Sequence, residues 1–135
     1  MKNKLTFAVD FDGTLCSYAF PNIGEQTEHQ KQLLDLLIKL KEAGHKLILW
    51  TNRGDNEEYK SLSEAIEWCK NKGLEFDCIN KNLPETEMKK ISGYSPKIMA
   101  DYYIDDKALA FNTSIDMSNT LSFLQNIRDI DNEQM

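Results

Sequence analysis

A chain of 135 residues is the size of one compact domain, and its 41% hydrophobic residues suffice to build a single core. The formal net charge of −6 argues against a nucleic-acid partner, because a grip on the phosphate backbone needs clustered Lys and Arg. No stretch approaches the roughly 20 apolar residues of a membrane span, so we expect no membrane partner either.

Two features of the sequence favour a cytoplasmic location. Residues Met1 to Lys4 lead straight into an apolar run and lack the small-residue cleavage site of a signal peptide. The cysteines, Cys16, Cys69 and Cys78, are odd in number and lack metal-ligand spacing. This usage fits free thiols in a reducing compartment better than a disulfide framework.

The apolar run at residues 5–9 predicts a buried strand that delivers two carboxylates to one turn. Asp10 and Asp12 project from the same edge, because side chains alternate along a strand and the chain then bends at Gly13. Two like charges held close together make each other harder to ionise, so such pairs persist mainly where a cation or a proton transfer compensates. The alternative is a plain polar turn after an edge strand.

The middle of the chain alternates between helix and strand. Residues 15–26 read as a loop or a small flap, after which Thr27 and Gln30 have the form of a capping box that begins a helix. Leucines recur at helical spacing until Gly44, and His29 and His45 at the two ends of this helix are predicted to be solvated.

A second strand and a second helix follow in the same order. Residues 46–50 are nearly all apolar, as expected for a strand covered on both faces, and they deliver Thr51. Asp55 has the position of an N-cap, with Glu58 three residues on, and Gly73 ends the helix.

The last third of the chain has weaker signals. We expect a third strand at 76–79, then turn residues with one short helix within 83–93, and a fourth strand at 102–104. A short fifth strand around Ile115 and a closing helix through residues 121–127 complete the pattern.

Alternating strands and helices predict an α/β fold, a doubly wound parallel sheet of about five strands with helices on both faces. Residues 1–130 form one domain of this Rossmann-like type, and residues 131–135 fray. Ligands of such sheets bind outside the carboxyl ends of the strands. If the first, second and fourth strands are neighbours, polar residues converge there, with Lys97 just before the last strand. These residues are Asp10, Asp12, Thr51, Asp105 and Asp106.

This set of side chains suits phosphoryl chemistry with Mg²⁺, which prefers carboxylates, a carbonyl and retained waters. Mg²⁺ and Lys97 would neutralise the phosphoryl oxygens, while Thr51 and the backbone N–H groups of the turn donate hydrogen bonds to them. Asp10 can then attack phosphorus to give an aspartyl-phosphate. Asp12 can protonate the leaving oxygen and later activate water.

The motifs Asp10-Phe11-Asp12-Gly13-Thr14-Leu15, Leu47 to Thr51, Lys97 and Asp105-Asp106 occur in an order that resembles the haloacid dehalogenase superfamily of phosphohydrolases. They frame about three quarters of the chain. The resemblance implies that Asp10 is the nucleophile and Asp12 the acid/base. It places Mg²⁺ on Asp10, on the main-chain carbonyl of Asp12 and on Asp105, with Asp106 acting through water or by orienting a neighbour.

Segments 15–26 and 80–100 are too short for the cap domains that many superfamily members insert there, so we expect a capless enzyme with an open site. A small phosphorylated substrate and a homo-oligomer that closes the site are favoured.

Several assignments leave alternatives open. Phe11, Asn52 and Arg53 are candidate substrate-binding residues, although Arg53 could equally face solvent. Thr51 could be a plain strand end, and Lys97 has rivals for the phosphate contact in Lys89, Lys90 and Lys107.

The reaction type also has alternatives. The acid/base Asp12 favours a phosphatase over a dehalogenase, because an alkoxide leaving group needs a proton and a halide does not. A phosphotransferase of the same superfamily, or a non-catalytic phosphate-binding domain on the same fold, remains as the alternative.

Overall fold

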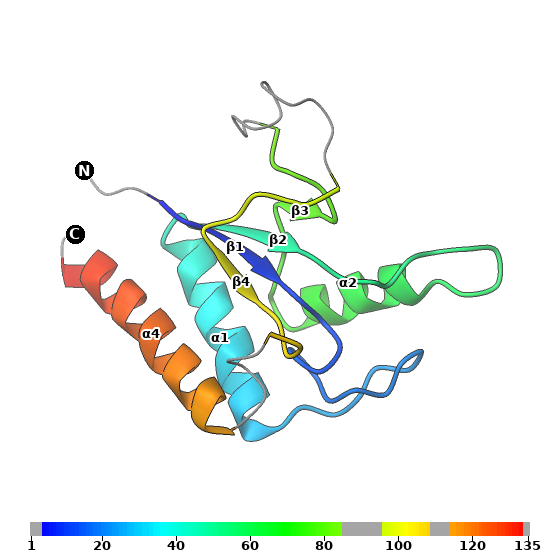
Figure 1. Ribbon diagram of the computed structural model, residues 1–135, viewed down its shortest axis with the longest axis horizontal. Helices are drawn as coiled ribbons and strands as arrows, with labels where there is room; N and C mark the ends of the chain where they lie inside the picture. The colour runs from blue at the N-terminus through cyan, green and yellow to red at the C-terminus, as the bar shows by residue number, and fades with distance from the viewer. Residues whose placement is uncertain (1–3, 85–95, 109–113, 134–135) are drawn as a thin grey trace.

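Four parallel strands form the sheet in the part of the chain that the computed structural model describes, residues 4–84, 96–108 and 114–133, with side chains left out at 114–116 and 131–133. The strand order is β3-β2-β1-β4, so the first strand lies between the second and the fourth, as the convergence of polar residues requires. The elements, shown in Figure 1, are β1 (Thr6–Val9), α1 (Glu28–Glu42), β2 (Lys46–Leu49), α2 (Ser61–Asn71), β3 (Cys78–Ile79), β4 (Tyr102–Ile104) and α4 (Ser114–Glu133).

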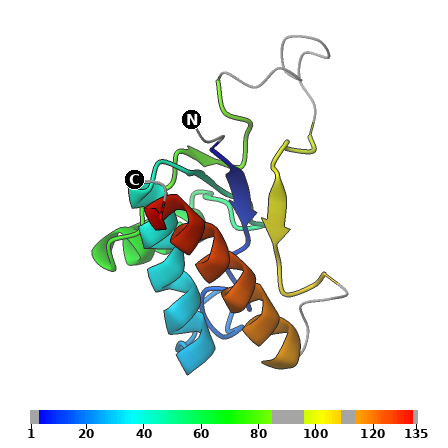
Figure 2. The same ribbon diagram turned by 90° about the vertical axis from the view of Figure 1, so that its left-hand side faces the viewer.

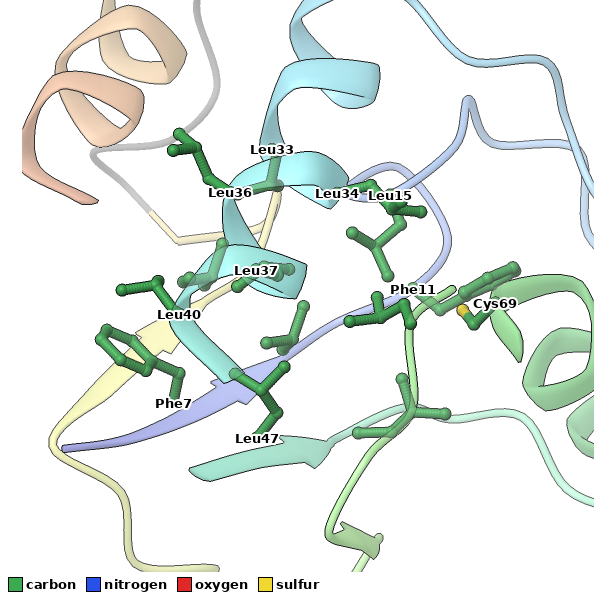
Figure 3. Packing of buried hydrophobic residues seen from close by; sticks show 14 of the residues in the cluster. Phe7, Phe11, Leu15, Leu33, Leu34, Leu36, Leu37, Leu40, Leu47 and Cys69 are labelled. Carbon is green, nitrogen blue, oxygen red and sulfur yellow. The ribbon is translucent and has the colours of Figure 1, made fainter. Parts of the chain in front are cut away.

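The two faces of the sheet are covered differently. Alternate residues of β1 and β2, such as Phe7 and Leu47, pack into a large cluster to which α1, α2 and α4 all contribute. Figure 2 shows α1 and α4 on the same side of the sheet, and Figure 3 shows the leucines of α1 packed over Phe7 and Leu47. On the other face, Ile48 packs against Leu83 and Ile98.

The predicted arrangement is therefore only partly met. The α/β class and the parallel sheet are confirmed, but the described residues supply four strands rather than five. Their three helices all pack into the cluster on one face, instead of covering both. Extended segments around Leu83 and Ile98 cover the other face, which is why the strands are apolar on both sides.

Helix α1 begins as predicted. The Thr27 hydroxyl accepts a hydrogen bond from the Gln30 backbone N–H (3.2 Å), and the Gln30 side chain accepts one from the Thr27 backbone N–H (2.8 Å). The prediction for His45 was wrong, since its side chain is buried and Nδ1 accepts a hydrogen bond from the Leu5 N–H (3.0 Å). The turn after α1 folds His45 against the edge of the Phe7 ring.

Helix α2 begins later than predicted, at Ser61 rather than just after Asp55. The Asp55 carboxylate still serves the helix terminus, because it accepts hydrogen bonds from the backbone N–H groups of Leu62 (3.1 Å) and Ser63 (3.0 Å) and from the Ser63 hydroxyl. Residues 56–60 form a loop that carries this carboxylate back onto the first turn of the helix.

The C-terminal part departs most from the prediction. Ile115 lies in α4 and not in a fifth strand, and α4 continues to Glu133, into the segment expected to fray. The third strand is reduced to Cys78–Ile79. Most of the short helix expected within 83–93 falls on residues 85–95, which lie outside the described residues. Among the helices that are described, none has the length and apolar character needed to cross a bilayer.

Candidate functional site

The carboxyl ends of β1, β2 and β4 meet around one cavity of about 190 Å³. From β1 the chain continues to β2 and β3 on one side, whereas β4 lies on the other side, so the cavity sits at the switch point where α/β sheets bind ligands. Of the predicted site residues, all except Phe11, Arg53 and Lys97 line it, together with Tyr18, Phe20 and Lys107. The predicted residues at the cavity are Asp10, Asp12, Thr51, Asn52, Asp105 and Asp106.

Three carboxylates at this edge form a candidate metal site. Single carboxylate oxygens of Asp10, Asp105 and Asp106 all lie within 4.8 Å of one another. Oδ1 of Asp106 is buried and receives no hydrogen bond from any described residue. A buried carboxylate oxygen without a donor is costly unless a cation satisfies it, and oxygen donors alone suit a hard ion such as Mg²⁺. The residues present therefore fit the metal that the sequence predicts.

The surroundings of Asp10 also favour the binding of a cation. Burial is the main cause that raises the pKa of Asp10 to about 8, followed by a hydrogen bond with Asp106 and the negative charge of Asp105. The Thr14 hydroxyl and the Phe11 backbone N–H act in the opposite direction on the pKa of Asp10 without overcoming these effects. A cation bound among the three carboxylates would favour the ionised form, which is the form that can act as a nucleophile.

Thr14 joins the two halves of the carboxylate cluster. Its buried hydroxyl donates to Oδ2 of Asp10 (3.0 Å) and accepts from the backbone N–H of Asp106 (3.0 Å). The neighbouring Gly13 has a φ of 86°, and a Cβ at that position would overlap the Asp106 carboxylate. No local pattern in the sequence predicts this role for Thr14, since its partner Asp106, just after β4, is 92 positions away.

The Arg53 side chain is buried, so the alternative that it faces solvent is wrong, and it does not line the cavity. The side chain is 2% exposed, and Nε and Nη2 donate to the two carboxylate oxygens of Asp12 at 2.8 Å each. The remaining N–H groups donate to the carbonyl oxygens of Pro21, Asn22 and Ser61. The hydrogen bond with Asp12 raises the pKa of Arg53 above its usual value. Arg53 is therefore a positioning residue for Asp12.

Phe11 packs against the Arg53 side chain from the hydrophobic core. Its ring is fully buried and packs edge-on against Trp68, with centroids 5.5 Å apart. The Arg53 guanidinium lies 5.0 Å from the Phe11 centroid and 5.1 Å from the Phe20 centroid. The Phe11 side chain therefore does not line the cavity, because the strand alternation that exposes Asp10 and Asp12 turns it into the core. A substrate contact of Phe11 stays a prediction for its backbone.

Thr51 is held in place by two hydrogen bonds. Its backbone N–H donates to the side-chain oxygen of Asn80 (2.8 Å), and its hydroxyl accepts from the backbone N–H of Arg53 (3.1 Å). The hydroxyl hydrogen remains available for a ligand in the cavity. Asn80 was not predicted as a site residue. Asn80 has a φ of 55°, a conformation that Asn tolerates better than most residues. An Asn directly after a strand is the one local feature of the sequence that points to this backbone conformation.

The lysine at the cavity is Lys107, which directly follows the two acidic residues at the end of β4. Its ammonium lies 3.8 Å from Oδ2 of Asp106. Lys97 does not line the cavity, since it is exposed and its ammonium lies 5.8 Å from the centroid of the Tyr103 ring. The other rivals, Lys89 and Lys90, fall in the part of the chain that is not described.

The Asp12 carboxylate lies apart from the candidate metal site. It is turned toward Arg53, and the three-carboxylate cluster does not include it. The sequence predicts that Asp12 contributes its main-chain carbonyl oxygen to the metal. The orientation of the side chain toward Arg53 does not conflict with that prediction. One backbone donor expected to serve the phosphate is already used, because the Asp10 N–H donates to the carbonyl oxygen of Ile104 (2.9 Å).

Comparisons with known proteins place the chain beside one solved structure. No protein-family model and no curated protein matches the chain. A conserved protein from Bacteroides thetaiotaomicron is 37% identical, with a TM-score of 0.71 and an alignment that covers 92% of each chain. At this identity over nearly the whole length, similarity extends well beyond a shared fold. The chain belongs to the same family as this conserved Bacteroides protein.

Proposed function

We propose that the protein is a Mg²⁺-dependent phosphatase, a capless member of the haloacid dehalogenase superfamily that hydrolyses a phosphate monoester through an aspartyl-phosphate. The observation that carries the proposal is the cluster of Asp10, Asp105 and Asp106 at one cavity, with a buried Asp106 oxygen that lacks a donor among the described residues. The sequence motifs that frame these residues support it.

The proposed chemistry begins at Asp10. A carboxylate oxygen of Asp10 attacks phosphorus, the bond from phosphorus to the ester oxygen breaks, and Asp12 gives that oxygen a proton, so that an alcohol leaves. Water then attacks phosphorus while Asp12 takes its proton, the bond from phosphorus to the Asp10 oxygen breaks, phosphate is released and the Asp10 carboxylate is regenerated. Both oxygens of Asp12 accept hydrogen bonds from Arg53. This arrangement orients Asp12 without placing it in the metal cluster.

The remaining groups act on the phosphoryl oxygens. Asp10, Asp105 and Asp106 would hold Mg²⁺, which when bound supplies positive charge next to the phosphoryl group. Lys107 adds a second positive charge from the cavity wall, and the Thr51 hydroxyl donates a hydrogen bond. Asn52 lines the same wall and offers its side-chain amide to the substrate.

We further propose a location, a substrate size and an oligomeric state for the enzyme. The enzyme is cytoplasmic, as its free cysteines favour. Its substrate is a small phosphorylated molecule, since the cavity of about 190 Å³ accommodates little more than the phosphoryl group and its metal. A homo-oligomer would close the open side of the site.

The test uses 4-nitrophenyl phosphate with and without Mg²⁺. We expect hydrolysis that requires Mg²⁺ and that falls by ~1,000-fold or more in Asp10→Asn, because this change removes the nucleophile while keeping its size. Asp35→Asn is the matched control, since Asp35 is an exposed carboxylate that pairs with Lys39 on α1. Turnover by a folded Asp10→Asn protein at the rate of Asp35→Asn would contradict the proposal.

A further inference from the structure

A second cavity, of about 400 Å³, lies next to the carboxylate site and has no role in the chemistry proposed above. Phe20 lines both cavities. Two segments contribute to both cavities: residues 18–21 after β1, and residues 51–61 after β2. In Figure 1 the segments that follow β1 and β2 extend toward the same side of the molecule. The two cavities are therefore neighbours on either side of Phe20, and a substrate whose phosphoryl group lies at the carboxylates can extend its leaving group toward the second one.

The walls of the second cavity are aromatic. Tyr59 is 59% exposed and Phe20 is 46% exposed, although aromatic side chains of this size are usually buried. Pro21 and Gly54 add further apolar or side-chain-free surface. Aromatic walls of this kind bind planar rings by stacking and edge contacts.

The backbone that carries Tyr59 is fixed by hydrogen bonds, and the Phe20 ring has a packing partner. The Tyr59 backbone N–H donates to the Asn56 side chain (2.7 Å), and the Asn56 backbone N–H donates to the Tyr59 carbonyl oxygen (2.8 Å). The Phe20 ring packs against the Arg53 guanidinium, which also donates to the carbonyl oxygen of Pro21. A preformed site of this kind loses little conformational entropy on binding.

We propose that the second cavity binds the leaving group of the substrate and that this group carries an uncharged aromatic ring. The inference rests on the proposed phosphatase function and names its substrate class. The acidic Asp55 in the wall disfavours a second phosphate or carboxylate on the leaving group. Asp55 itself is occupied by the first turn of α2, so it contributes charge rather than a specific hydrogen bond to a ligand.

The kinetic test compares benzyl phosphate with butyl phosphate, because both release an unactivated alcohol and they differ mainly in the ring. We expect the kcat/KM of the wild type to favour benzyl phosphate by about 10-fold, the effect of one good aromatic contact. Tyr59→Ala should lower this preference several-fold. Phe123→Ala is the matched control, since Phe123 is an exposed aromatic residue on α4 that lines neither cavity, and it should keep the preference.

A binding measurement separates this inference from the phosphatase proposal. Benzylphosphonate, which cannot be hydrolysed, is titrated into the ¹⁵N-labelled protein with Mg²⁺ present, and we expect the amide signals of Gly54, Asn56 and Tyr59 to shift. Butylphosphonate should shift them less. Unshifted signals, or a benzyl preference that survives Tyr59→Ala, would overturn the leaving-group site even if Asp10-dependent turnover is found. If the wild type hydrolyses no phosphate ester but these amide signals still shift, the phosphatase proposal would be overturned and a ring-binding site would remain.

Discussion

Asp10 and Asp12 are two residues apart, yet the fold gives their carboxylates different neighbours. Asp10 faces two more carboxylates, whereas Asp12 faces a guanidinium that is buried and fully hydrogen-bonded. Two carboxylates in different electrostatic surroundings can take different roles, one as nucleophile and one in proton transfer. At the scale of single residues, Arg53 and Thr14 therefore give the two carboxylates their different surroundings, because Arg53 bonds Asp12 and Thr14 bonds Asp10.

Removing Arg53 should destabilise the whole protein as well as displace Asp12. In Arg53→Met the carboxylate of Asp12, which is 12% exposed, loses both donors, and three backbone carbonyl groups lose theirs. Breaking a buried ion pair in this way costs about 3–5 kcal/mol in the free energy of unfolding, which urea denaturation measures. Arg128→Met, a half-buried control on α4, should cost about 0.5 kcal/mol or less. Equal losses in the two variants would show that solvent readily replaces the bonds of Arg53.

The identity of the phosphate-binding lysine can be tested by a direct comparison. Because Lys107 lines the cavity and Lys97 does not, Lys107→Ala should lower the kcat/KM for 4-nitrophenyl phosphate by about 10-fold or more, and Lys97→Ala much less. Both lysines are exposed, so neither change should affect stability. The opposite order of losses would show that the lysine ahead of β4 reaches the phosphate when substrate binds.

At the scale of elements, the segment between β1 and α1 forms a flap that is tied down at both ends. Its base is closed by the Ser17 N–H, which donates to the Glu25 carbonyl oxygen (2.7 Å), and its tip by Arg53, which bonds the carbonyl groups of Pro21 and Asn22. This flap supplies Tyr18 and Phe20 to the cavities. The position of these aromatic residues therefore depends on backbone contacts far from the carboxylates.

A methyl group at Gly24 should open this flap. A Cβ at Gly24 would overlap the Ser17 carbonyl oxygen, which is part of the backbone and cannot turn aside. We expect Gly24→Ala to cost about 1–3 kcal/mol of stability and to speed hydrogen exchange at the Ser17 amide. Gly54→Ala is the matched control, because nothing lies within 4 Å of a Cβ there. Unchanged exchange at Ser17 in Gly24→Ala would mean that the flap accommodates the methyl group.

The sequence predicts those elements whose signals are local. The capping box at Thr27 and the leucine spacing of α1 identify that helix, and the apolar run before Asp10 identifies β1. The start of α2 could not be predicted, because Asp55 accepts hydrogen bonds from backbone groups seven and eight positions on, whereas a local cap reaches only two or three. Ile115 was wrongly placed in a strand, because a short apolar run does not distinguish a strand from the first turn of a helix.

The same distinction applies to the site. Carboxylates and a threonine at strand ends could be found from the sequence, since parallel strands end at one edge of a sheet. The partners of Arg53 could not, because its bonds to Asp12 and Asn22 span 41 and 31 positions and have no periodic pattern. Long-range contacts between loops are set by the fold as a whole and leave no mark in a local window.

At the scale of the whole molecule, the order of the strands brings like charges together. Placing β4 beside β1 sets Asp105 and Asp106 next to Asp10, and the protein already carries a net charge of −6. Holding three carboxylates at one edge is unfavourable for the metal-free fold, because each charge raises the cost of the others. Metal binding should therefore stabilise the molecule, and the size of that effect should depend on pH.

The direction of this dependence follows from the pKa of Asp10, which is about 8 in the folded protein and close to the ordinary 3.8 in the unfolded chain. Between these values the folded protein holds a proton that the unfolded chain has released, so the free energy of unfolding of the metal-free protein should fall as the pH rises. Mg²⁺ must displace this proton when it binds. It should therefore raise the melting temperature by several degrees at about pH 8 and by much less at about pH 5.

Differential scanning fluorimetry with Mg²⁺ or EDTA, at both pH values, measures these effects. In Asp10→Asn, which has no proton to lose, the metal-free protein should be more stable than the wild type at about pH 8, and its gain from Mg²⁺ should be smaller. Asp35→Asn changes an exposed carboxylate outside the cluster and should respond like the wild type. An Mg²⁺ effect in the wild type that is the same at both pH values would show that the metal does not compete with a proton on Asp10, and would remove the carboxylate cluster as its binding site.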